Sequence, residues 1–98
     1  MSIFGIKALF GRSEGEISSC VQHTAEAINP LVSTKLTESL DDRQLTLGFL
    51  SESAEETIIQ TVKNLSGLFP LSSFYLSIEE DDYLNVLKVV NRQAKWQD

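Results

Sequence analysis

Residues 31–50, LVSTKLTESLDDRQLTLGFL, have a counterpart forty residues later in residues 71–90, LSSFYLSIEEDDYLNVLKVV. The match needs no gap and extends to residues 13–50 over 53–90, where nine positions are identical. A period of 20–50 residues is typical of one supersecondary unit that is used more than once. We therefore expect a single α+β domain over residues 1–98 with two internal repeats.

Each repeat begins with a predicted helix. The pattern Ser-x-x-Glu at 13–16 and at 53–56 has the spacing of a capping box, whose side chains satisfy free N–H groups of the first turn. Apolar residues then recur at helical spacing, and each run stops before a proline, which disfavours helix at the preceding residue. The sequence predicts helices over 14–28 and 54–67.

A predicted β-hairpin follows each proline. The predicted strands are 32–40, 43–50, 72–79 and 83–90, with an acidic pair of aspartates between the strands of each hairpin. A two-residue turn at each pair fixes which residues face each other. In this register the apolar residues share one face, and the predicted core beneath the helices is Leu36, Leu47, Phe49, Leu76, Leu87 and Val89.

The N-terminal segment decides the sheet order. As a strand, residues 3–10 place Phe4, Ile6, Ala8 and Phe10 on one face. The order is then β-α-β-β-α-β-β, which predicts a two-layer sandwich, a ferredoxin-like βαββαβ arrangement with an extra C-terminal edge strand. A helical N-terminus over residues 1–12 is the alternative, and it gives αββαββ.

Charge and composition exclude several classes of partner. The formal net charge is -6 and the sequence pI is about 4.6. Residues 13–87 carry -10, while residues 1–12 and 88–98 each carry +2. An acidic body repels phosphate backbones and anionic lipid headgroups, so we expect neither nucleic acid nor membrane as a partner.

The single cysteine and the N-terminal segment indicate the cellular compartment of the protein. Cys20 has no partner for an internal disulfide, which agrees with a reducing compartment. The segment 1–12 lacks a continuous apolar region and a small-residue cleavage site, so it does not resemble a signal peptide. We expect a cytoplasmic protein.

No catalytic, cofactor or metal motif is present in the sequence. Cys20 and His23 lie three residues apart, but a structural zinc site needs four ligands and there is no other cysteine or histidine. The acidic run 79–82 matches no EF-hand loop and is expected to be a solvated turn. The glycines form neither a GxGxxG nor a Walker pattern. We therefore expect no catalytic residue, no metal and no cofactor, and a protein that is not an enzyme.

The sheet face away from the helices is the predicted binding surface. In the second repeat this face is apolar at four positions that are mostly polar in the first repeat. Such a patch needs a cover, which could be a second copy, another protein, a ligand, or the C-terminal tail with its tryptophan. The predicted partner-binding residues are Tyr75, Leu84, Val86, Val90 and Trp96.

Two functions fit these expectations. The favoured one is a small acidic protein-interaction module, of the adaptor, inhibitor, immunity or chaperone type, that acts through the apolar sheet face. Its partner is then itself, as a homodimer, another protein, or both. The alternative is a small-molecule-binding homodimer of the dimeric α+β barrel kind, a class that includes enzymes, with a cavity between facing sheets. Convergent polar groups around such a cavity would distinguish the alternative.

Overall fold

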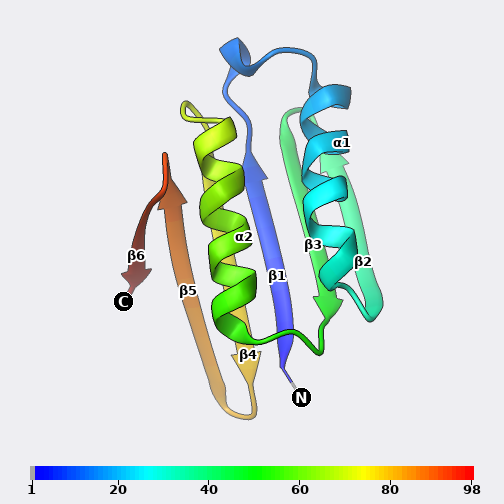
Figure 1. Cartoon of the computed structure of the whole chain (residues 1–98), viewed down its shortest axis with the longest axis vertical. Coiled ribbons are helices and arrows are strands. Elements are labelled where there is room, and N and C mark those ends of the chain that lie inside the picture. The colour runs from blue at the N-terminus through cyan, green and yellow to red at the C-terminus, as the bar shows by residue number, and fades with distance from the viewer. Residues whose placement is uncertain (1) are drawn as a thin grey trace.

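Apolar residues at every second position make the first segment a strand. The computed structural model describes residues 2–98, which form two helices on one face of a six-stranded antiparallel sheet (Figure 1). The prediction of an α+β sandwich is confirmed. In chain order the elements are β1 (Ile3–Leu9), α1 (Ile17–Ile28), β2 (Thr34–Asp41), β3 (Gln44–Leu50), α2 (Glu55–Leu68), β4 (Ser73–Glu80), β5 (Tyr83–Val90) and β6 (Gln93–Gln97).

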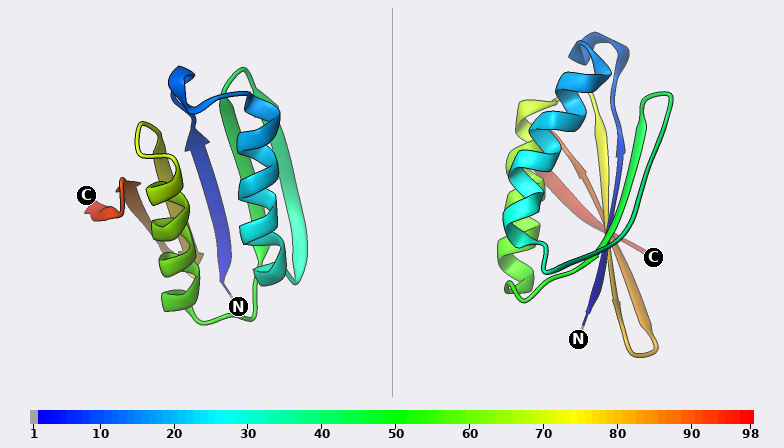
Figure 2. Two further views of the ribbon diagram at one scale, coloured as in Figure 1. Left: turned by 45° about the horizontal axis from the view of Figure 1, so that its top comes forward. Right: turned by 90° about the vertical axis from the view of Figure 1, so that its right-hand side faces the viewer.

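The strands lie in the order β2-β3-β1-β4-β5-β6, and all neighbours are antiparallel. The N-terminal segment is therefore central in the sheet, where a strand with apolar residues on both faces is usually found. The helical alternative for this segment is wrong, because Ile3–Leu9 form a strand. Each helix joins two strands that have a third strand between them. Both helices cover the same face, and the other face of the sheet is open (Figure 2).

The core lies between the helices and the sheet. Its central row crosses four strands in register, from Leu47 through Ile6 and Leu76 to Leu87. Five of the six predicted core residues face the helices, with Phe49, Leu76, Leu87 and Val89 buried and Leu47 partly buried against the core. For these five residues, the predicted facing is confirmed.

Leu36 is the exception, because the first hairpin has a different register. Its turn is Asp42–Arg43 rather than Asp41–Asp42, so Leu47 lies opposite Glu38. A β-bulge then falls at Leu36, which is 47% exposed. In the second hairpin the turn is Asp81–Asp82 and Leu76 lies opposite Leu87, as predicted.

The helices begin later than the capping boxes predict. The first residues of α1 and α2 follow Glu16 and Ala54, and neither residue makes a side-chain cap hydrogen bond. Before α1 the chain forms a short 3-10 turn at 12–14 and then passes through Gly15 at φ 97, a conformation that glycine adopts without a steric penalty. Both helices end before their proline, as predicted.

The C-terminal tail forms a strand. A two-residue turn at Asn91–Arg92 returns the chain along β5, so β6 and not β5 is the edge strand. The Arg92 backbone N–H donates to the Ser66 Oγ of α2 at 2.8 Å, and its guanidinium donates to Asn64 Oδ1 at 3.2 Å. These contacts hold the turn against α2, and they explain why the predicted extra edge strand is followed by another.

Within residues 2–98, neither helix has the length and apolarity that crossing a lipid bilayer requires.

Candidate functional site

The open face of the sheet, defined as the face away from α1 and α2, is the candidate site. Successive residues of a strand point to opposite faces of the sheet, so the residues that come directly before and after a buried residue lie on the open face. Tyr75, Leu84, Val86 and Val90 alternate with the buried residues of β4 and β5 and lie on the open face. The structure therefore brings four of the five predicted binding residues to one surface.

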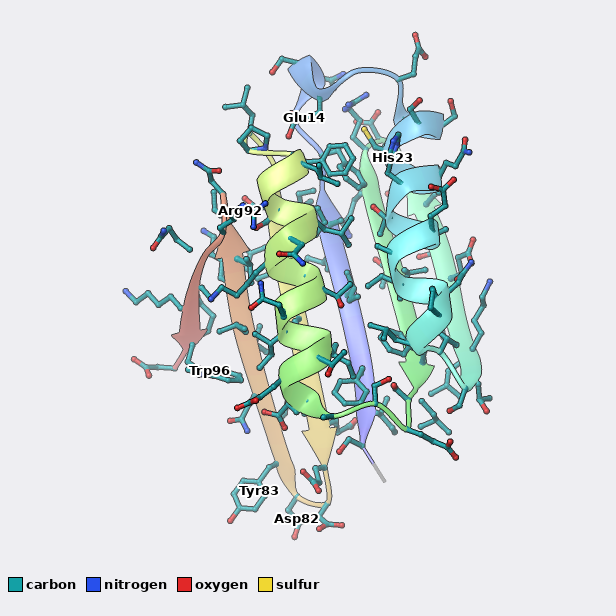
Figure 3. The ribbon with its side chains drawn as sticks, viewed as in Figure 1. Glu14, His23, Asp82, Tyr83, Arg92 and Trp96 are labelled. Carbon is teal, nitrogen blue, oxygen red and sulfur yellow. The ribbon has the colours of Figure 1, made fainter. Side chains whose placement is uncertain are left out.

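Trp96 does not belong to this surface. The register of β6 places Trp96 opposite Leu87, which faces the helices. Its side chain is 48% exposed at the edge of the sheet on the helix side (Figure 3). The prediction that Trp96 shares a face with Tyr75 and Val86 is wrong, because the tight turn makes the tail a strand beside β5 instead of a cover over the open face.

A row of lysines around Tyr75 crosses the middle of the open face. Lys7 of β1 and Lys88 of β5 lie opposite Tyr75 on its two sides, and Lys95 of β6 lies opposite Lys88. The Nζ atoms of Lys7 and Lys88 each lie 5.7 Å from the centroid of the Tyr75 ring, within the range of a cation–π interaction. We call Lys7, Tyr75, Lys88 and Lys95 the lysine row.

Apolar side chains lie on both sides of the lysine row. They come from β1, β3 and β5, and all are at least partly exposed: Ile3, Leu9, Leu50, Leu84, Val86 and Val90. Leu84 is the most accessible of them at 65% exposure. The open face therefore combines a cationic and aromatic centre with apolar flanks, a combination that suits a partner with acidic and apolar groups.

A shallow hollow of about 320 Å³ lies beside the lysine row. Gly5 forms part of its floor, and Lys7, Thr46, Tyr75, Ser77 and Val86 line it. The Ser77 hydroxyl occupies the space that a Cβ at Gly5 would need. A side chain at position 5 would have to displace the Ser77 hydroxyl, and its absence keeps this part of the sheet surface low.

The acidic residues lie mostly away from the centre of the open face. The second hairpin ends in the acidic tip, Glu79–Asp82, which extends beyond the helices (Figure 3). The tips of both hairpins bend away from the helices, toward the open-face side (right view of Figure 2). Within the tip, Glu79 lies opposite Leu84 on the open face, whereas Glu80 lies opposite Tyr83 on the other face. Asp41, opposite Gln44 at the tip of the first hairpin, adds a carboxylate at the other end of the open face, so its charge is separated into a basic centre and acidic ends.

The remaining candidate residues have structural surroundings. Cys20 is buried in the core, and burial raises the pKa of its thiol, although the nearby Arg43 guanidinium opposes that shift. His23 is exposed, and its Nδ1 lies 2.8 Å from the Ser19 carbonyl oxygen. Within residues 2–98, no group of three or more histidine, cysteine or acidic side chains could hold a metal ion.

Most of the lysine row could not be predicted from the sequence. Strand alternation does not fix which residue lies opposite Lys7, and the sequence predicts no strand in the tail that holds Lys95. The signal that could have found them is the strand register, since Lys7, Tyr75, Lys88 and Lys95 occupy one continuous set of cross-strand partners. That register depends on β1 lying next to β4 and on β6 existing at all.

Comparison with protein-family models, with curated proteins and with solved structures gave no match.

Proposed function

We propose that this protein is an interaction module that binds another protein chain through the open face of its sheet. The observation that carries this proposal is the composition of that face. Apolar residues such as Leu84 and Val86 are accessible around a lysine row, although the equivalent positions in the first repeat, Gln44 and Thr46, are polar. Polar side chains are therefore acceptable on this scaffold, and folding alone does not require the apolar ones.

The test is a charge in the centre of the surface. Val86→Glu places a carboxylate where a partner would remove it from water, which is strongly unfavourable without a compensating charge. We expect the variant to lose both self-association in sedimentation and retention of specific proteins from the native lysate. Gln60→Glu on the exposed side of α2 is the matched control and should behave as wild type.

Circular dichroism should show that Val86→Glu is folded, because Thr46 shows that a polar residue is acceptable on this face. If wild type neither self-associates nor retains any protein that Val86→Glu loses, the proposal is wrong.

A small-molecule-binding dimer is the second candidate, and the hollow beside Tyr75 favours it. Lys7, Thr46, Tyr75 and Ser77 give it polar groups, and a second sheet over the face would enclose it. An anionic ligand would suit the lysine. Saturable binding of a small anion that Lys7→Ala abolishes would favour this candidate over a surface that binds only proteins.

We also infer that the fold is ferredoxin-like and that the internal repeats, residues 13–50 and 53–90, arose by duplication, with β1 and β3 related by the same shift of forty residues. The pairing of β1 with β3 supports this inference. At the middle of this ladder lie the pairs Ile6–Leu47 and Lys7–Thr46, whose members are 41 and 39 residues apart, so a two-fold axis between these pairs relates positions forty residues apart. The β1–β3 ladder is thus consistent with two-fold symmetry between the copies.

A further inference from the structure

Three adjacent cross-strand rows on the open face carry opposite charges on the two sides of an uncharged middle row. The middle row is Gly5–Ser77–Val86. The row Lys7–Tyr75–Lys88 lies two residues away along each strand in one direction. The row Ile3–Glu79–Leu84 lies two residues away in the other direction. The middle row is therefore equally far from a basic row and from a row that contains a single carboxylate.

We propose that two copies of this chain bind each other through their open faces, around a two-fold axis that crosses the strands along the Gly5–Ser77–Val86 row. Glu79 of each copy then lies over Tyr75 of the other copy, between Lys7 and Lys88. This proposal rests on the proposed function and identifies the partner as a second copy.

The position of the axis follows from charge complementarity. An axis along the lysine row would place Lys7 and Lys88 of one copy opposite Lys7 and Lys88 of the other. An axis along the Glu79 row would place the two Glu79 carboxylates opposite each other. Like charges across an interface cost several kcal/mol. Of the three rows, only the middle one pairs the lysines of one copy with the carboxylate of the other.

The side chains near the axis also fit close contact between two sheets. Gly5 has no side chain and Ser77 has a small one, so little stands between the two faces at the centre. Val86 would contact its own counterpart, and Leu84 would lie over the alkyl stem of Lys88 in the other copy. Face-to-face sheets pack about 10 Å apart, a distance that a lysine and a glutamate from opposite sheets can bridge.

The experiment is a charge reversal followed by its compensation. Glu79→Lys removes the attraction and adds a repulsion at two symmetry-related contacts. Each contact is worth at least about tenfold in affinity, so the dimer dissociation constant should rise about a hundredfold. Lys88→Glu should have a similar effect. The double variant Glu79→Lys/Lys88→Glu restores opposite charges and should recover most of the affinity in sedimentation equilibrium.

Neighbouring residues give matched controls. Glu80→Lys makes the same change in net charge one residue away, on the opposite face of β4, and should leave the dimer intact. Lys63→Glu on α2 is the control for Lys88→Glu. Circular dichroism should show that all five variants are folded.

Three results would overturn the proposal: a wild type that stays monomeric at its highest soluble concentration, a Glu79→Lys effect no larger than that of Glu80→Lys, or a double variant that recovers no affinity. These results are distinct from failure of the proposed function. A dimer that Val86→Glu dissociates but that ignores the reversals keeps the open face as the interface and rejects only this arrangement.

Discussion

Leu76 in the second hairpin is completely buried, whereas Leu36, its counterpart in the first hairpin, is 47% exposed. The two leucines occupy the same position of the repeat, five residues before an acidic pair. However, β4 is an interior strand beneath α2, and all eight residues of β2, at the edge of the sheet, are exposed. Matching sequence therefore gives matching strands, while the place of a strand in the sheet decides whether its side chains are buried in the core.

The turns of the two hairpins explain part of this difference. In the first hairpin the Arg43 guanidinium donates to the carbonyl oxygens of Phe10 at 3.1 Å, and of Gly11 and Gly15 at 2.8 Å. These bonds place Arg43 inside the turn and attach the hairpin to the chain between β1 and α1. The turn is thereby one residue later than the repeat predicts. The cross-strand partner moves by two for the residues from Thr37 to Asp41, and by one for Thr34 and Lys35 beyond the bulge.

Truncation of the two leucines should show the largest contrast. Leu76→Ala removes a fully buried side chain from the centre of the core and should lower the free energy of unfolding by about 2–5 kcal/mol. Leu36→Ala removes an exposed side chain at a bulge and should cost less than about 1 kcal/mol. Urea unfolding of both variants measures the difference. Equal losses would mean that the two hairpins are packed alike.

Removal of the turn anchor should have an intermediate effect. Arg43→Ala loses three hydrogen bonds from a charged donor and should cost about 1–3 kcal/mol in the free energy of unfolding. Tyr83 holds the equivalent position in the second repeat and is 72% exposed, so Tyr83→Ala is the comparison and should cost less than about 0.5 kcal/mol. If thermal unfolding ranks the two variants in the reverse order, Arg43 does not anchor the first hairpin.

Glycine in the turns should have the smallest effect. Asp42 and Asp81 adopt φ values of 54 and 53, a left-handed conformation that costs energy for residues other than glycine. Asp42→Gly and Asp81→Gly should each raise the free energy of unfolding by up to about 1 kcal/mol, because the relief of strain exceeds the entropy that glycine adds to the unfolded chain.

Here the two hairpins should agree, since the exposed Arg12–Asp42 ion pair, at 3.5 Å, contributes little. A marked loss of stability in only the Asp42→Gly variant would give that ion pair a larger role.

Much of the fold was predictable because the signals are local. Apolar alternation made residues 3–10 a strand, and prolines 30 and 70 marked where the helices end. The register of the second hairpin was predictable for the same reason, since its two-residue turn coincides with the acidic pair. The first capping box misled because Gly15, at φ 97, interrupts the chain between Ser13 and the start of α1.

Four of the five candidate site residues could be placed on one face from strand alternation alone, namely Tyr75, Leu84, Val86 and Val90. Trp96 could not, because its position depends on the Asn91–Arg92 turn. That turn is held by Ser66 and Asn64 of a helix 26 and 28 residues earlier in the chain. No pattern within the tail itself carries that information.

The sequence by itself determined which segments before residue 91 are helices and strands and which residues of β4 and β5 face the helices, because hydrophobic periodicity and turn residues act over a few neighbouring positions. Only the tertiary structure decided the register in which β1 pairs with β4, and that β6 lies beside β5. Those pairings bring Lys7, Lys88 and Lys95 into one row with Tyr75, and leave Glu79 two residues beyond the middle row. Cross-strand neighbours are set by the hydrogen-bonded register between distant segments, so charges that are scattered along the chain become a surface only when the sheet forms.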